Sequence, residues 1–159
     1  MRILGIDPGY ERIGIAILEK APNKKEEVLF SECFKTSPKL SLSERFLLIG
    51  EEVKNVIEKY KPKALAIETL FFTTNQKTAM GVAGARGVII YEGMRAGLKL
   101  YEYNPLQIKI AVTGYGKATK EQVIIMTKKL VSIDEKINSD DEIDAIAIGL
   151  TCLASEKFK

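Results

Sequence analysis

The sequence predicts an α/β protein in which helices flank a five-stranded mixed sheet. Two observations carry this prediction. Short apolar runs at residues 3–6 and 64–67 are typical of strands that are covered on both faces. Between them, residues 41–60 carry apolar side chains at the spacing of one helical face, the usual crossover between parallel strands. The 159 residues are enough for one domain, over 1–159, with a single core.

The other elements follow in chain order. Residues 12–18 and 28–34 predict strands that return from the first strand as a meander, and residues 98–103 predict a fifth strand after a parallel fourth. Gly14, inside the second strand, marks either a bulge or a close approach of another segment. The remaining predicted helices cover about 76–95, 105–112, 119–130 and 139–153.

Capping residues mark the predicted helix starts. In a capping box, a Ser or Thr side chain and a Glu or Gln three residues later each accept a hydrogen bond from the other's backbone N–H. We expect this arrangement to open the last two helices, and a serine to cap the first. The residues are Ser41 or Ser43, Thr119 with Gln122, and Ser139 with Glu142.

Composition excludes several kinds of chemistry. The chain has no histidine, which removes Ser-His-Asp and Cys-His catalysis and histidine metal ligands. Cys33 and Cys152 fit no metal spacing and are expected to be buried thiols in a reducing compartment. No apolar run reaches membrane-spanning length and the start has no signal-peptide pattern, so we expect a cytoplasmic protein. The net charge of +3 is compatible with a polyanionic partner.

Both predicted buried strands end in a carboxylate, Asp7 before Pro8-Gly9 and Glu68 after residues 64–67. If these strands are parallel neighbours, the two acids stand side by side at the sheet edge where ligands of α/β proteins bind. Two close carboxylates repel unless a cation neutralises them. The alternative is that Asp7 only caps the Pro8-Gly9 turn.

The last helix adds Asp141 and Asp144, which share a helix face at i and i+3. Asp144 borders the apolar stripe of this helix and could reach the sheet edge. The acids of the first turn have an alternative role, because negative charge stabilises a helix N-terminus. Four carboxylates from three segments form a ligand set that suits a hard cation such as Mg²⁺ or Mn²⁺.

The chain carries five short motifs in this order: Gly5-Ile6-Asp7-Pro8-Gly9, Ala66-Ile67-Glu68, Asn75, Ala85-Arg86-Gly87 and Asp141-x-x-Asp144-Ala145. In these motifs the sequence resembles the RuvC family of Holliday-junction resolvases. The resemblance implies an RNase-H-like fold, a homodimer, and a Mg²⁺-dependent endonuclease that nicks two strands of a four-way junction symmetrically, leaving 5′-phosphate and 3′-hydroxyl ends. It also implies a branch-migration motor as a partner.

By position, the resemblance makes Asp7, Glu68, Asp141 and Asp144 the catalytic carboxylates and metal ligands, with two Mg²⁺ ions per site and Mn²⁺ as a substitute. Some members of the family have histidine where Asp141 stands, so Asp140 or Glu142 could take its place.

A DNA-binding surface beside these acids needs cations. Candidates for phosphate contacts are Arg86, Lys109, Lys117 and Lys120, with Lys77 and Arg45 as further possibilities. Lys109 and Lys120 stand at positions that resemble the family's basic DNA-contacting residues. The glycine-rich residues 114–117 could let backbone N–H groups approach a phosphate. The alternative for any one lysine is an exposed side chain without a partner.

Two further candidates lie in the loop after Glu68. The resemblance favours Phe71 as a side chain that stacks on bases or wedges between them, and Asn75 belongs to the family's motif. The alternative for Phe71 is packing in the core.

Three glycines, Gly81, Gly84 and Gly87, lie along one strip of a predicted helix, where each costs about 1 kcal/mol relative to alanine. Close packing explains them, either against the chain's own sheet or against a second subunit.

Two other functions compete with the nuclease. One is an actin-like or sugar-kinase-like ATPase lobe, which opens with a similar Asp-x-Gly turn but needs a second lobe. The other is a non-catalytic junction-binding module, which is expected to lack one of the acids.

Overall fold

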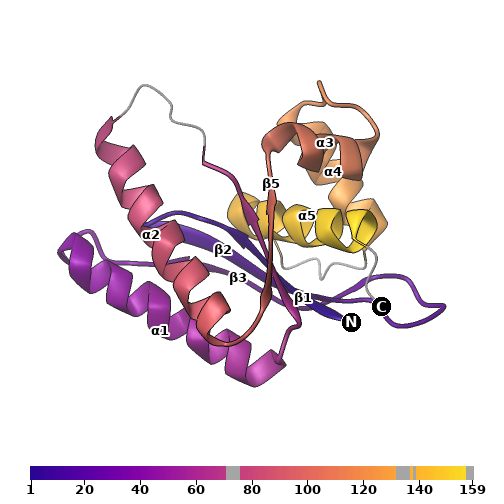
Figure 1. The fold of residues 1–159 in the computed structure, drawn as a ribbon. Helices are drawn as coiled ribbons and strands as arrows, with labels where there is room; N and C mark the ends of the chain where they lie inside the picture. The colour runs from indigo at the N-terminus through magenta and orange to yellow at the C-terminus, as the bar shows by residue number, and fades with distance from the viewer. Residues whose placement is uncertain (71–75, 132–136, 138, 157–159) are drawn as a thin grey trace.

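The computed structural model describes residues 1–70, 76–131, 137 and 139–156. Its centre is a five-stranded sheet with the order β3-β2-β1-β4-β5 (Figure 1). The first three strands pair antiparallel, and β4 and β5 add to β1 in parallel, which confirms the predicted mixed sheet. The strands are β1 Arg2–Asp7, β2 Arg12–Glu19, β3 Glu27–Lys35, β4 Ala64–Glu68 and β5 Lys99–Tyr103.

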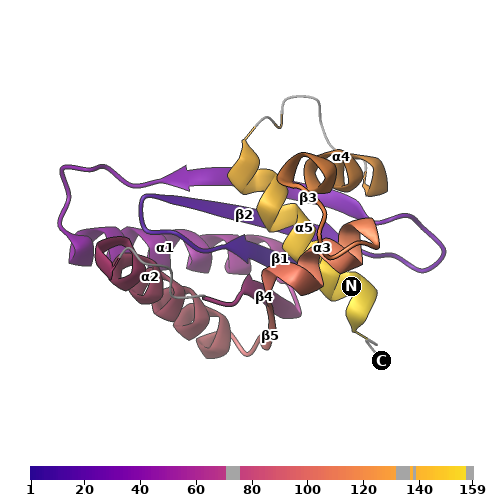
Figure 2. The same cartoon turned by 90° about the horizontal axis from the view of Figure 1, so that it is seen from above.

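Helices cover both faces of the sheet, as predicted (Figures 1 and 2). One layer consists of α1 and α2, and the other of α3, α4 and α5, with a separate apolar core on each side of the sheet. None of the described helices is long and apolar enough to cross a membrane. The helices are α1 Leu42–Tyr60, α2 Gln76–Arg95, α3 Pro105–Thr113, α4 Lys120–Leu130 and α5 Asp140–Ser155.

The structure confirms some of the predicted helix caps. Ser41 caps α1 with Glu44 in a capping box, and the box of Thr119 with Gln122 at α4 is confirmed. The box predicted for Ser139 and Glu142 is wrong, because Ser139 makes no capping hydrogen bond with its side chain. These two side chains instead serve neighbouring groups: the Ser139 hydroxyl lies 3.3 Å from Asp141 Oδ2, and Glu142 accepts from Ser31 at 2.9 Å.

Helix α5 lies directly on the middle of the sheet because two glycines leave room for its backbone. A Cβ atom on Gly14 would stand 1.9 Å from the carbonyl oxygen of Asp141, and one on Gly5 would stand 2.4 Å from that of Ala145. Gly14 therefore marks a close approach, one of its two expected roles. The register irregularity between β2 and β3 lies elsewhere, at Ile17 and Leu18. The close approach of α5 to Gly14 sets the first turn of α5 against the start of β2.

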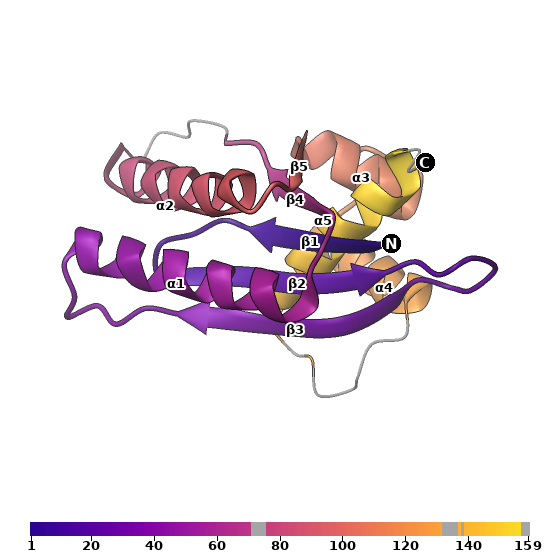
Figure 3. The ribbon, with the colours of Figure 1, turned by 60° about the horizontal axis from the view of Figure 1, so that its bottom comes forward.

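The glycines of α2 do not form one packing strip. A Cβ atom on Gly81 would meet the ring of Tyr10 at 2.7 Å, and one on Gly84 would meet the ring of Phe46 at 2.2 Å, so both glycines pack inside the chain. Gly87 has nothing within 4 Å of a Cβ atom and faces open space. Figure 3 shows α1 and α2 side by side on this face of the sheet. Packing inside the chain therefore explains Gly81 and Gly84, whereas packing of Gly87 against a second subunit stays a prediction.

Candidate active site

The two strand-end acids stand where the sequence predicted. In the parallel pair of β1 and β4, Ile6 is the register partner of Ile67, so the next residues, Asp7 and Glu68, lie side by side at the carboxyl edge. The strands are buried from Ile3 and from Ala64 up to these residues. The register of rigid backbone therefore fixes the Cα atoms of Asp7 and Glu68 side by side.

These acids share a desolvated space with Asp144. Burial above all, together with the charges of Asp144, Glu68 and Asp141, raises the pKa of Asp7 to about 7, against a smaller opposing effect of Lys120. Burial and the charge of Asp144 likewise raise the pKa of Glu68. Such shifts arise where carboxylates face one another without enough positive charge between them. The space therefore favours a bound cation or a proton.

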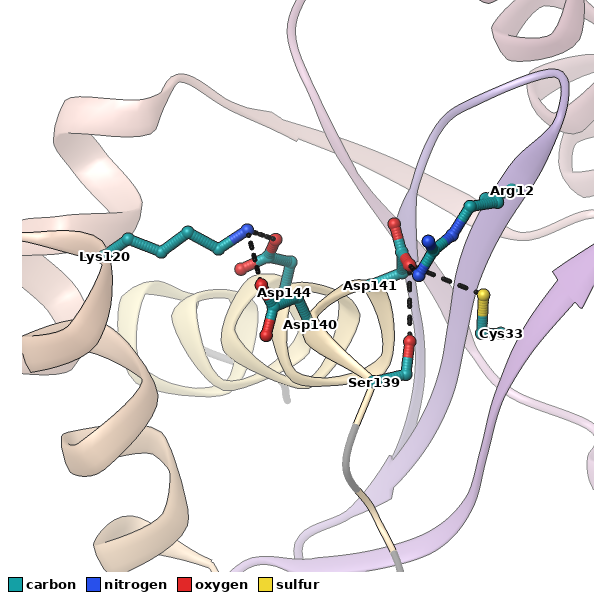
Figure 4. Close-up of polar contacts among 7 residues, drawn as sticks. All are labelled: Arg12, Cys33, Lys120, Ser139, Asp140, Asp141 and Asp144. Atoms are coloured by element: carbon teal, nitrogen blue, oxygen red, sulfur yellow. Dashed lines mark hydrogen bonds and ion pairs between the residues drawn. The ribbon is translucent and has the colours of Figure 1, made fainter.

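Asp144 is met by a lysine from α4 (Figure 4). The Nζ atom of Lys120 lies 3.3 Å from Asp144 Oδ2 and 3.4 Å from Asp140 Oδ2. Burial raises the pKa of Asp144, and the charge and hydrogen bond of Lys120 oppose that rise. Lys120 thus faces the acidic site itself, as well as being a candidate for contact with DNA.

Asp141 turns the other way (Figure 4). Its Oδ2 atom accepts from the guanidinium of Arg12, from the Cys33 thiol at 3.4 Å and from the Ser139 hydroxyl at 3.3 Å. Burial raises the pKa of Asp141, but these donors outweigh it and lower the pKa below its ordinary value. Asp141 and Asp144 start from one helix face, as predicted, yet their carboxylates point apart because a different cation meets each one.

The two neighbours of Asp141 that could replace it are engaged differently. Asp140 is the more exposed of the acids near Lys120, with 59% of its side chain accessible. Glu142 is turned to Ser31 on β3. Among the residues that the structure describes, Arg12 pairs with Asp141 and with neither of these neighbours.

A cavity of about 210 Å³ opens beside the acids, between α3, α4 and α5. Glu68 and Asp144 line one side of it, and Lys109 and Lys120 supply positive charge. Apolar side chains form the rest of the lining, from Pro105, Ile108, Val123, Ala147 and Ile148.

The predicted DNA-contacting residues fall into separate groups. Lys109 is half-buried at the cavity and Lys117 is exposed in the turn that follows α3. Arg86 is mostly buried: its Nε donates to the Glu68 carbonyl oxygen at 3.1 Å, and its guanidinium pairs with Glu102. It therefore braces the end of β4. Phe71, Asn75 and the side chain of Lys77 lie outside the described residues.

The prediction that Arg45 contacts DNA is wrong, because its side chain is buried. Its side chain is 8% exposed, lies 5.5 Å from the centre of the Tyr10 ring, and donates to the Leu40 carbonyl oxygen at 3.3 Å. It holds the start of α1 against the turn after β1.

Sequence reasoning missed Arg12, Cys33 and Ser139 as partners of Asp141. A signal for Arg12 was present in the hairpin: Asp7 pairs with Gly14, which places Arg12 two residues further along at the same sheet edge. Cys33 follows from the next pairing, because it is the partner of Gly14 on β3. It is half-buried, so the prediction of two buried thiols holds only for Cys152.

Comparison with known proteins identifies the family. The family model for crossover junction endodeoxyribonuclease RuvC matches residues 3–152. The chain belongs to the RuvC family. The resemblance given by its motifs and the prediction of an endonuclease are confirmed at this level, and the family implies dependence on a divalent metal.

RuvC relatives match along the whole chain. A crossover junction endodeoxyribonuclease RuvC from Halothermothrix orenii is 45% identical over 150 residues, covering 94% of this chain and 90% of that protein. The RuvC of Thermosipho melanesiensis is 43% identical over 156 residues, covering 98% of each chain.

Solved structures agree with the RuvC assignment. T. thermophilus RuvC in complex with a Holliday junction substrate is similar at a TM-score of 0.90 and 33% identity, covering 97% of this chain and 93% of that chain. A yeast mitochondrial Holliday junction resolvase matches at a TM-score of 0.69 with 12% identity over 96% of this chain and 79% of that chain, a likeness of fold alone. The predicted RNase-H-like fold is confirmed.

The donor chemistry of the site suits a divalent metal. Carboxylate oxygens are the ligands that hard cations prefer, and the raised pKa values of Asp7, Glu68 and Asp144 mark negative charge that a cation would relieve. As the described side chains lie, no three carboxylates or thiols stand together as a finished ligand set. Asp141 pairs with Arg12 and Asp144 with Lys120, so a metal held by all four predicted acids would have to compete with these two cations.

Proposed function

We propose that this chain resolves four-way DNA junctions by paired, symmetric nicks that leave 5′-phosphate and 3′-hydroxyl ends, in recombination and repair. The observation that carries the proposal is the cluster of Asp7, Glu68 and Asp144, whose pKa values are raised at the edge where β1 and β4 end. Membership in the RuvC family and the likeness to a RuvC bound to a Holliday junction support it.

The metal ligands in this proposal are Asp7, Glu68, Asp141 and Asp144, for two Mg²⁺ ions that Mn²⁺ can replace. Bound there, the ions would activate the attacking water and neutralise charge on the leaving oxygen of an in-line displacement. The chain contributes the arrangement: Asp7 and Glu68 are fixed by the sheet, and Arg86 braces Glu68 through its carbonyl oxygen.

The cations around the site would hold the DNA. Lys120 lies 3.3 Å from Asp144, so a phosphate that approaches the acids meets its charge. Lys109 lines the same cavity and Lys117 is exposed nearby in the chain. Phosphate contacts of this kind give affinity without sequence specificity. We assign Phe71 to stacking at the junction and Asn75 to DNA contact on the resemblance alone.

The proposed homodimer has a candidate surface on the layer of α1 and α2. A groove of about 520 Å³ lies between these helices, lined by Phe46, Leu47, Val88 and Tyr91 among others. Leu47 is 63% exposed and Tyr91 is 61% exposed, and Met94 in the next turn is 55% exposed. A two-fold dimer suits a substrate with two equivalent scissile strands.

A labelled four-way junction tests the activity. Paired nicks with Mg²⁺ and none with EDTA support the resolvase, whereas ATP turnover without nicking would support the kinase-like alternative. Sedimentation of the DNA-free protein should give about twice 17.7 kDa, and Tyr91→Glu should shift it toward the monomer. A wild type that stays monomeric even on junction DNA would contradict the dimer. A cytoplasmic location and a branch-migration motor remain part of the proposal.

A further inference from the structure

Arg12, like Lys120, pairs with a proposed metal ligand and leaves its charge largely open to solvent. Its side chain is 55% exposed, whereas that of its partner Asp141 is 22% exposed. Asp7 pairs with Gly14 on β2, so Arg12 lies beyond the end of β1 at the same edge as the acids. The guanidinium is therefore reachable from the side on which a DNA strand must approach.

The arginine also neutralises a charge that the site needs. With Arg12, the Cys33 thiol and the Ser139 hydroxyl all on its Oδ2 atom, Asp141 is directed away from Asp144 and Lys120 (Figure 4). A guanidinium binds a carboxylate and a phosphate through the same planar fork of N–H donors. A phosphate can therefore replace Asp141 on Arg12 without any change in the kind of bond.

We propose that Arg12 is a positioning residue with two alternating partners: it holds Asp141 in the DNA-free protein, and it passes to a backbone phosphate of the bound strand when Asp141 turns to a divalent cation. This inference rests on the proposed function. It links loading of the metal to binding of the DNA, because each event releases the group that the other requires.

The exchange predicts how the affinity for a divalent cation changes when the ion pair between Arg12 and Asp141 is removed. An exposed ion pair typically contributes up to about 1 kcal/mol, so its removal should tighten divalent-cation binding by about two- to fivefold. We would titrate Mn²⁺ into DNA-free protein by calorimetry for the wild type, Arg12→Gln and Arg12→Lys. Arg12→Gln should bind Mn²⁺ more tightly than the wild type, and Arg12→Lys, which keeps the charge but loses the fork, should lie between them.

Lys35 gives a matched control. It is exposed and is the register partner of Arg12 across β2 and β3, so Lys35→Gln removes the same charge from the same edge. Under the exchange, Lys35→Gln changes Mn²⁺ affinity much less than Arg12→Gln does. The gain from Arg12→Gln should also vanish in an Asp141→Asn background, because the pair is already broken there.

The second partner is tested with DNA. In gel-shift titrations on a four-way junction with Ca²⁺, Arg12→Gln should weaken binding several-fold and reduce the salt dependence by about one phosphate contact. Equal Mn²⁺ affinities for Arg12→Gln and Lys35→Gln, or unchanged junction binding in Arg12→Gln, would overturn the exchange while a wild type that still nicks junctions keeps the proposed function. A wild type that binds no Mn²⁺ and nicks no junction would overturn both.

Discussion

The acids at the ends of β1 and β4 and the acids near the start of α5 face the same sheet edge, but different features hold them in place. Backbone pairing fixes Asp7 and Glu68, since the register of two buried parallel strands sets them side by side. The directions of Asp141 and Asp144 depend on side-chain torsions and on the cations Arg12 and Lys120 that meet them.

The two pairs also differ in how far neighbouring cations neutralise their negative charge. Burial and mutual repulsion raise the pKa values of Asp7 and Glu68, whereas Arg12 and its companions lower that of Asp141. The strand acids therefore form a rigid site that requires positive charge, and the helix acids form an adjustable part. Of the two helix acids, Asp144 still has a raised pKa despite Lys120, and only Asp141 already has enough positive charge beside it. The comparison predicts larger effects from changes to the strand acids than from changes to Asp141 and its partners.

The largest expected effect is on cleavage. Asp7→Asn keeps the side-chain volume but removes a charge from the rigid part of the site, so nicking of a four-way junction should fall by about 10³-fold. Junction binding in Ca²⁺ should stay unchanged or become tighter, because one carboxylate fewer repels the phosphates.

Glu58→Gln is the control for this variant, since Glu58 is exposed on α1, on the other face of the sheet. We expect the same separation of cleavage from binding for Glu68→Gln and Asp144→Asn, and a smaller loss for Asp141→Asn. A folded Asp7→Asn protein that nicks at nearly the wild-type rate would exclude this active site.

The next effect is on stability against pH in EDTA. The pKa of Asp7 is about 7 in the fold, against 3.8 for an unperturbed aspartate side chain, so between these values the fold binds a proton that the unfolded chain has released. The contribution of Asp7 to stability is therefore complete below about pH 4 and is lost as the pH rises through 7. We expect the free energy of unfolding, relative to Asp7→Asn, to fall by about 3 kcal/mol between pH 4 and 8.

Urea titrations of both proteins across this pH range measure that difference. Adding a divalent cation at pH 8 should restore part of the lost stability in the wild type only. A difference between the two proteins that does not vary with pH would mean that Asp7 is not in a desolvated, acidic environment.

Sequence reasoning predicted the rigid part of the site better than the adjustable part. Every predicted strand and helix agrees with the structure to within two residues at each end. Apolar periodicity indicates which face of an element is buried, and Pro or Gly residues indicate where the element ends. Asp7 and Glu68 follow from that pattern, since parallel register is enough to bring them together.

The directions of Asp141 and Asp144 could not be predicted in the same way. They depend on which cation from another element comes within reach, and helix spacing carries no information on that. Arg45 shows the same limit, because nothing in its local sequence records that Tyr10 and Glu11 cover it.

An effect of intermediate size is expected on stability, from a change that tests how closely α5 packs on the sheet. Gly14→Ala places a methyl group 1.9 Å from the backbone of Asp141, so α5 must shift, and we expect a loss of about 1–3 kcal/mol in the free energy of unfolding. Gly87→Ala is the matched control: its methyl group meets nothing within 4 Å, and it should stabilise α2 by about 0.5–1 kcal/mol. Equal stabilities for these two variants would contradict the close approach of α5.

The smallest effect separates two helix starts that look alike in sequence. Thr119 completes a capping box at α4, so Thr119→Ala should cost about 1 kcal/mol in the free energy of unfolding. Ser139 makes no such bond at α5, and its hydroxyl lies 3.3 Å from the carboxylate of Asp141. Ser139→Ala should therefore cost only a few tenths of a kcal/mol, while it removes one of the donors that hold Asp141 toward Arg12.

Urea denaturation of both variants measures the difference, and Mn²⁺ calorimetry should show slightly tighter binding for Ser139→Ala alone. If Ser139→Ala instead costs as much as Thr119→Ala and leaves Mn²⁺ affinity unchanged, Ser139 is a helix cap after all and not part of the adjustable half of the site.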